Sequence, residues 1–157
     1  MRTYEEPQKA PKNPKNFAIP INLQRRAKKN RATVFGMEPK IRVLVANDPR
    51  AYREVIADAL PKLRPLVEVF PAEPEELERE AVRVRPHLIL CSQSIGGALA
   101  RDERLLAWMV LYPDGEDRAE VGGAISERAA LLLEGVAFDD LLRVVDETEH
   151  LLLRLPA

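Results

Sequence analysis

From Ile41 onward, short runs of β-branched and other apolar residues alternate with segments whose apolar residues recur at helical spacing. Three runs have the length and nearly continuous apolar character of buried strands: Ile41–Ala46, Leu66–Phe70 and Leu88–Cys91. Strands that alternate with helices in this way build βαβ units. The pattern therefore predicts an α/β domain over residues 37–157, with a doubly wound, mostly parallel sheet.

Two helices are expected between these strands. The first follows Asn47-Asp48-Pro49, where we expect Asp48 to be the N-cap and Pro49 the first helical residue. The second helix opens at Pro74. Its expected inner face is formed by Leu77, Ala81 and Val82.

The C-terminal part is less regular. We expect a fourth strand at Trp108–Tyr112, further strand pieces at Ala119–Ile125 and Ala130–Leu133 with little or no helix between them, and a last helix from Phe138. Two apolar stripes run along that helix. One stripe should cover the sheet, and the second is a possible interaction face for a protein partner or a second copy of the chain. It includes Val144, Leu151 and Leu155.

Residues 1–36 differ in composition from the remainder. They carry nine basic and two acidic side chains, a net charge of +7, whereas residues 37–157 carry −8. Proline is frequent and large apolar residues are few, so we expect a disordered basic extension. Its basic cluster offers possible nucleic-acid contacts through Arg25, Arg26, Lys28, Lys29 and Arg31. Alternatively, translation starts at Met37 and the extension is not part of the mature protein.

Several classes of chemistry lack their usual residues. Cys91 is the only cysteine, which excludes an internal disulfide and fits a cytoplasmic protein. No apolar run approaches the roughly 18–20 residues that span a bilayer. The chain has neither a Cys/His cluster at zinc spacing nor a glycine-rich phosphate loop. We therefore predict no cofactor, no metal, no membrane partner and no catalytic residues.

Three segments carry a resemblance to a known family. IRVLVANDP, RPHLILCSQ and LLLEGVAFDDLLRVV resemble the first strand, the third strand and the final strand with its helix in the receiver domain of two-component response regulators. The resemblance covers about residues 41–155 and implies a flavodoxin-like fold. It also implies a remnant of the acidic pocket at Asn47, Asp48 and Ser92, with Ser92 at the phosphoacceptor position, or Cys91 with a one-residue slip.

The chain departs from the receiver pattern at its chemical positions. One carboxylate of the acidic pair is replaced by Asn47, the phosphoacceptor aspartate is absent, and Tyr112 follows the fourth strand where the family has serine or threonine. Glu134-Gly135 stands where the family has Lys-Pro. Phosphoryl transfer needs the acceptor carboxylate and a Mg²⁺ ion held by carboxylates.

We therefore interpret the chain as a non-phosphorylatable pseudo-receiver, not an enzyme, that acts in signalling through protein–protein interaction. Two alternatives remain open. The first is a nucleic-acid-binding regulatory protein that uses the basic arm. The second is a small-ligand sensor at the carboxyl edge of the sheet, because ligands of doubly wound sheets bind there. That edge would be lined by Asn47, Asp48, Ser92, Gln93 and Tyr112.

Overall fold

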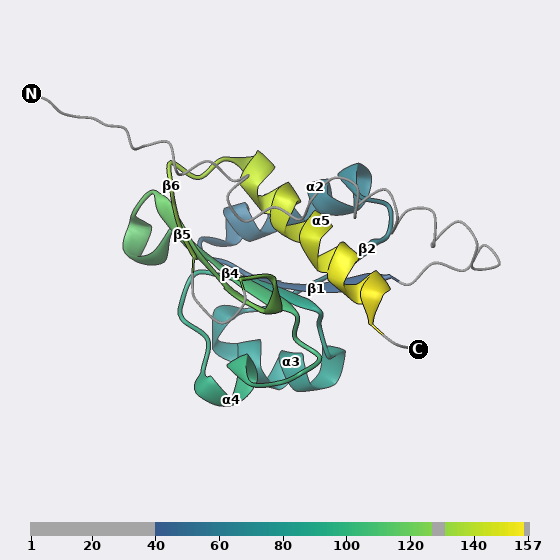
Figure 1. Ribbon diagram of the computed structural model, residues 1–157. Helices are drawn as coiled ribbons and strands as arrows, with labels where there is room; N and C mark the ends of the chain where they lie inside the picture. The colour runs from purple at the N-terminus through teal and green to yellow at the C-terminus, as the bar shows by residue number, and fades with distance from the viewer. Residues whose placement is uncertain (1–39, 127–130, 156–157) are drawn as a thin grey trace, which may run out of the picture.

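The structure is a computed structural model that describes residues 40–126 and 131–155. It is an α/β fold in which one sheet lies between two layers of helices (Figure 1). The strands are β1 (Ile41–Ala46), β2 (Val67–Pro71), β3 (Leu88–Cys91), β4 (Ala107–Leu111), β5 (Arg118–Gly123) and β6 (Leu131–Glu134). The α-helices are α2 (Arg50–Leu63), α3 (Leu77–Val84), α4 (Gly97–Ala100) and α5 (Phe138–Arg154), and short 3₁₀ turns are η3 (Pro74–Glu76), η4 (Pro113–Gly115) and η5 (Ala124–Ser126).

The sheet has the strand order β2-β1-β3-β4-β5-β6. Strands β2, β1, β3 and β4 are mutually parallel, and β5 is antiparallel to both of its neighbours. The expectation of a mostly parallel sheet is therefore confirmed. Because β1 pairs with β2 on one side and β3 on the other, the chain reverses its direction of winding at β1, which opens a crevice at the carboxyl ends of β1 and β3.

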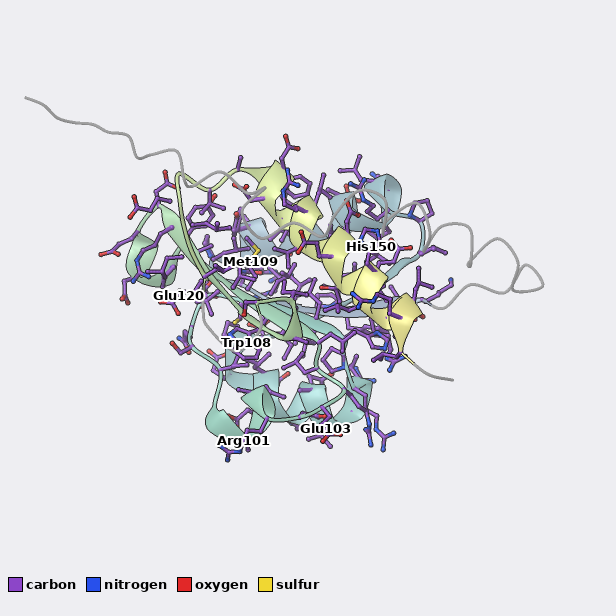
Figure 2. All side chains as sticks on the ribbon, viewed as in Figure 1. Arg101, Glu103, Trp108, Met109, Glu120 and His150 are labelled. Carbon is purple, nitrogen blue, oxygen red and sulfur yellow. The ribbon has the colours of Figure 1, made fainter. Side chains whose placement is uncertain are left out.

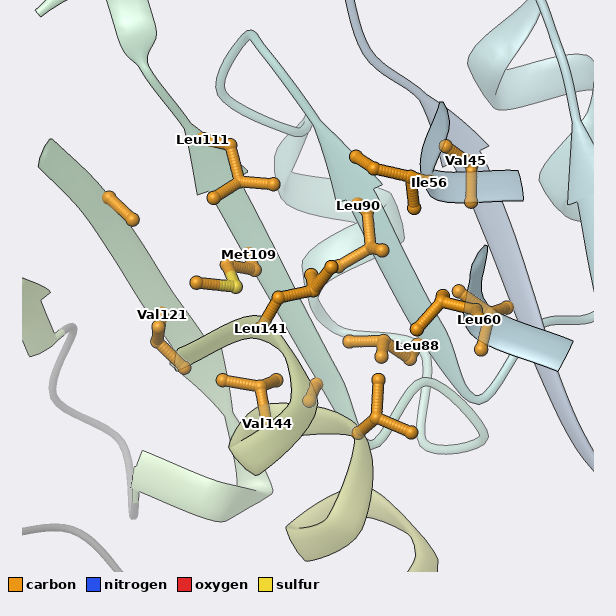
Figure 3. Packing of buried hydrophobic residues seen from close by; sticks show 14 of the residues in the cluster. Val45, Ile56, Leu60, Leu88, Leu90, Met109, Leu111, Val121, Leu141 and Val144 are labelled. Atoms are coloured by element: carbon orange, nitrogen blue, oxygen red, sulfur yellow. The ribbon is translucent and has the colours of Figure 1, made fainter. Parts of the chain in front are cut away.

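Helices α2 and α5 cover one face of the sheet, and α3 and α4 lie on the other (Figure 1). The larger core cluster forms under α2 and α5, where Ile56 and Val144 meet strand residues such as Leu90 (Figure 3). The smaller cluster lies toward α3. Successive residues of a strand serve opposite faces: Met109 belongs to the first cluster and Trp108 packs against the second (Figure 2).

The inner face expected for the second helix is partly wrong. Val82 is 78% exposed, and Val84 is buried in its place. The 3₁₀ turn at Pro74–Glu76 delays the α-helix until Leu77, so that the buried positions fall four and seven residues later, at Ala81 and Val84. Val82, five positions after Leu77, therefore points to solvent.

The start of α2 also differs from expectation. The helix begins at Arg50 with Pro49 as its N-cap, and no side chain caps it. Asp48 is therefore not the cap. Its carboxylate instead faces Arg53, with 3.8 Å between Asp48 Oδ1 and Arg53 Nη1.

The two stripes expected on the last helix are halves of one broad buried face. Leu141, Val144 and Val145 belong to the same core cluster. Val144 is 0% exposed, so it cannot contribute to an exposed interaction face. Thr148 is buried beside it, and its hydroxyl donates to the Val144 carbonyl at 2.8 Å. Of the expected face, Leu151 is partly exposed and Leu155 is 50% exposed.

The region after β4 forms strands, as expected, with boundaries shifted by one or two residues. β5 runs beside β4, with Gly122 opposite Trp108. A Cβ atom at Gly122 would clash with the Trp108 ring, so only a glycine leaves room for the indole at this position of β5. Ala130, the expected start of the second strand piece, lies outside the described residues, as does the predicted extension 1–36.

Candidate functional site

The carboxyl ends of β1, β3 and β4 meet at one edge of the sheet. The structure brings the residues that follow them together there, as the sequence predicts for Asp48, Ser92, Gln93 and Tyr112. They surround a pocket of about 700 Å³. The remaining lining residues are Pro49, Tyr52, Asp114 and Gly115. The pocket lies beside the crevice at which β1 and β3 diverge, where ligands of doubly wound sheets bind.

Ser92 links the ends of β3 and β1. Its hydroxyl accepts a hydrogen bond from the Asp48 backbone N–H at 2.9 Å and lies 3.3 Å from the Asp48 carbonyl oxygen, to which it donates. The side chain at the position that the receiver resemblance assigns to the phosphoacceptor is thus engaged with the neighbouring loop. This contact fixes the spacing between the two loops that form one wall of the pocket.

Arg53 is a buried cation behind this wall. Its side chain is 6% exposed, and it donates to the Asn47 carbonyl oxygen at 3.0 Å and to Glu73 Oε2 at 3.2 Å. The sequence analysis missed Arg53, because a charged residue within an amphipathic helix normally faces solvent. Arg53 is the buried residue of the first turn of α2, whereas Arg50 and Ala51 beside it are exposed.

Asn47 does not line the pocket. It is fully buried, and neither Oδ1 nor Nδ2 of its side chain has a hydrogen-bond partner among the described residues. Such unpaired buried amides are uncommon in folded proteins. Of the three residues of the predicted remnant pocket, Asp48 and Ser92 therefore line a cavity, and Asn47 stands behind them.

Two tyrosines form a corner of the pocket. The ring centroids of Tyr52 and Tyr112 are 5.3 Å apart, with the planes inclined at 55°. Both rings also pack against the main core cluster. Burial, and secondly a hydrogen bond with Tyr112, raises the pKa of Tyr52, so this phenol stays neutral. Tyr52 was missed as a site residue because its spacing marks it as part of the apolar face of a helix.

Cys91 and His87 are buried, and each forms a hydrogen bond with a backbone atom. Burial raises the pKa of Cys91 to about 12, and its thiol donates to the Gln93 carbonyl oxygen at 3.0 Å. A thiol in this state is a poor nucleophile. His87 accepts a hydrogen bond from the Arg42 N–H on Nδ1 at 3.0 Å, and burial, with a smaller effect of the Arg42 charge, lowers its pKa to about 4.

Three further expectations from the sequence concern metal binding, membrane spanning and nucleic-acid contacts. Among residues 40–126 and 131–155, no group of three or more His, Cys, Asp or Glu side chains is arranged to hold a metal ion. No helix in this part of the chain has both the length and the apolar character needed to cross a bilayer. The basic cluster of Arg25, Arg26, Lys28, Lys29 and Arg31 lies outside the described residues.

Comparison with known proteins gives no relative from which a role could be transferred. No protein-family model, no curated protein and no solved structure matches the chain.

Proposed function

We propose that this protein is a regulatory module of the receiver type, with a flavodoxin-like fold, that signals through protein–protein contact without accepting a phosphoryl group. The observation that carries the proposal is the role of Ser92. The residue at the phosphoacceptor position has no carboxylate, and its hydroxyl is held between the backbone N–H and C=O of Asp48. Ser92 therefore joins the loop after β3 to the loop after β1.

The arrangement of the sheet supports this reading. Four parallel strands in the order β2-β1-β3-β4, with α2 and α5 on one face and α3 on the other, are compatible with a flavodoxin-like fold. The antiparallel β5 is a departure. It occupies the part of the chain in which a receiver has its fourth helix, and it separates β4 from the strand that leads into the last helix.

The charges at the carboxyl edge also support it. Two carboxylates line the pocket, Asp48 and Asp114, and none of the lysines and arginines in residues 40–126 and 131–155 does so. A phosphorylated receiver needs Mg²⁺ held by clustered carboxylates and a cation that faces the phosphoryl oxygens. Arg53, whose Nη1 lies 3.8 Å from Asp48 Oδ1, is already bonded to Glu73 and to the Asn47 carbonyl.

The contact surface in this proposal is the C-terminal end of α5. Leu151 and Leu155 retain exposure there, whereas Val144 is excluded by its burial. A small apolar patch at a helix end can serve as the centre of a protein interface. A second copy of the chain is the first partner to test.

Intact-mass measurement after incubation with acetyl phosphate and Mg²⁺ tests the chemical part of the proposal. We expect no gain of a phosphoryl group by the full chain, in the wild type or in Ser92→Ala. The Ser92→Asp variant restores a carboxylate at the position and is the informative comparison. A phosphorylated wild-type protein would overturn the proposal.

Sedimentation analysis of the full chain tests the contact surface. We expect concentration-dependent self-association that Leu155→Glu abolishes. Val82→Glu is the matched control, because Val82 is an exposed valine on α3, on the opposite face of the sheet. A chain that stays monomeric at high micromolar concentration argues against a homodimer, and equal effects of the two variants argue against α5 as the surface.

A further inference from the structure

The pocket at the carboxyl edge has the size of a small-molecule site. Its volume of about 700 Å³ falls within the roughly 300–1,000 Å³ typical of ligand sites. Three loops, after β1, β3 and β4, contribute its walls. Ligands often bind in pockets that several loops form at the edge of a sheet. The residues that line this pocket therefore indicate what it could bind.

The aromatic wall is held in place before any ligand arrives. Tyr52 and Tyr112 form a tilted pair with centroids 5.3 Å apart. The Tyr112 hydroxyl donates to the Val136 carbonyl oxygen at 3.2 Å, and both rings rest on the core cluster. An aromatic ring attracts a cation placed over its face, because the ring quadrupole is negative there.

The ionised side chains that line the pocket are acidic. Asp48 and Asp114 contribute carboxylates, whereas the other lining residues that the structure describes carry no charge at neutral pH. Arg53 comes within 3.8 Å of Asp48, yet its stronger contacts are with Glu73 and the Asn47 carbonyl. Asp48 therefore shares Arg53 with Glu73, and the electrostatic balance of the pocket favours a positively charged ligand.

We propose that this pocket binds a small organic cation, of the alkylated or quaternary ammonium class. Its charged group lies against the faces of Tyr52 and Tyr112, with Asp48 and Asp114 as counter-ions. Ser92 and Gln93 offer hydrogen bonds to a polar substituent of the ligand. Hard metal ions require several oxygen ligands around one point, an arrangement that no acidic cluster of the described residues supplies. An anionic ligand would face two carboxylates and no cation among the described lining residues.

This proposal goes beyond the regulatory function above and does not depend on it. A module that signals without phosphotransfer needs some input, and an organic cation would provide one. Binding of the cation and phosphorylation by acetyl phosphate are measured separately, so either proposal can fail while the other survives.

The test is isothermal titration of the full chain with choline and with 3,3-dimethylbutan-1-ol, its uncharged carbon isostere. The two probes have nearly the same shape, so their difference isolates the positive charge. We expect saturable binding of choline and binding of the isostere that is weaker by about tenfold, because a desolvated cation–π contact is worth about that factor. Inorganic phosphate should not bind at this pocket.

Variants locate the binding. Tyr52→Leu removes an aromatic face and Asp114→Asn removes a charge, and each should weaken choline binding by roughly tenfold. Asparagine tolerates the left-handed backbone of Asp114, whose φ is 56°, so this variant should keep its fold. Tyr52→Phe keeps the ring and should keep most of the affinity. Glu103→Gln is the matched control, an exposed carboxylate on the α4 side of the sheet, away from the pocket (Figure 2).

Three outcomes would overturn the proposal. Choline could fail to bind, or it could bind no better than its uncharged isostere. It could also bind with an affinity that neither Asp114→Asn nor Tyr52→Leu alters. Because Asp114 lies on an exposed turn, its variant remains interpretable even if Tyr52→Leu does not fold.

Discussion

At the end of β1, the Asn47 side chain is shielded from water without gaining a hydrogen bond from the described residues. An unpaired buried amide disfavours the folded state by roughly 1–3 kcal/mol. Asn47→Leu has a similar volume and no polar atoms, so it should leave the free energy of unfolding unchanged or raise it by about 1 kcal/mol. Urea denaturation at pH 7 measures this change, and a loss of stability would mean that the amide has a partner in solution.

Asn47→Asp should act in the opposite direction. It restores the acidic pair of the receiver pattern but buries a carboxylate, whose pKa the low-dielectric surroundings would raise. The folded state then binds a proton more readily than the unfolded state, so stability is lost as the pH rises above the unfolded pKa. We expect a deficit relative to wild type that is larger at pH 7 than at pH 4.5, measured by the same denaturation experiment.

His87 makes stability depend on pH with a defined sign. Its pKa is lowered from 6.5 to about 4 in the folded state, mainly by burial, so the unfolded chain binds the proton more tightly. The contribution of neutral His87 is therefore complete above about pH 6.5 and is lost as the pH falls toward 4.

The reference for this prediction is His87→Asn. The asparagine amide oxygen can accept the Arg42 N–H bond in place of Nδ1, and it does not titrate. We expect wild type to lose stability relative to His87→Asn between pH 7 and pH 5. Chemical denaturation of both proteins at each pH measures this loss. A pH-independent difference between the two proteins would show that the pKa of His87 is the same in the folded and unfolded states.

At the scale of elements, Arg64 and Asp146 join the end of α2 to the middle of α5. The pair is bidentate, with Arg64 Nε 2.6 Å from Asp146 Oδ1 and Nη2 2.9 Å from Oδ2. A double-mutant cycle with alanine at both positions should give a coupling of about 0.5–1 kcal/mol, because the pair remains partly exposed to solvent.

The pair Lys62 and Asp58, on the surface of α2, is the matched comparison. Its single contact of 3.0 Å joins two side chains that are both largely exposed. We expect its coupling to be no more than about 0.3–0.5 kcal/mol, as for ordinary i,i+4 pairs. Equal couplings would indicate that the bidentate geometry adds nothing to the docking of α5.

The sequence predicts β1 and β3 correctly to the residue because continuous apolar runs mark strands buried on both faces. The positions of Val82 and Val144 were missed for a different reason. Apolar periodicity gives the width of a helical face, but the turn before α3 and the sheet beneath α5 determine which part of that face is buried. The antiparallel direction of β5 follows from the short connection at residues 112–117, since parallel neighbours need a crossover of a dozen or more residues.

At the scale of the whole molecule, parallel topology explains why most of the candidate site could be predicted. The carboxyl ends of β1, β3 and β4 must share one edge, so Asp48, Ser92 and Tyr112 had to meet there. Tyr52 and Asp114 could not be assigned to the site in advance. One resembles a core residue of a helix and the other a turn residue, and only the folded chain brings both to the pocket.

The division of charge along the chain gives a prediction for the whole molecule. Residues 37–157 have a net charge of −8 and should not bind RNA or DNA, whereas any affinity of the full chain should depend on residues 1–36. A salt titration of RNA and DNA binding, made with the full chain and with residues 37–157 alone, measures this dependence. Equal binding of nucleic acid by the full chain and by residues 37–157 would contradict the assignment of the contacts to Arg25–Arg31.

Tyr112 also touches the segment that leads into α5. Its hydroxyl bonds to the Val136 carbonyl, and Asp117 Oδ1 accepts the Val136 N–H at 3.1 Å. One side chain is therefore shared between the pocket and the start of α5, the helix that carries Leu151 and is followed by Leu155. If a bound cation shifts this ring, its binding and the docking of a partner on α5 are thermodynamically linked. Each must then alter the equilibrium constant of the other by the same factor.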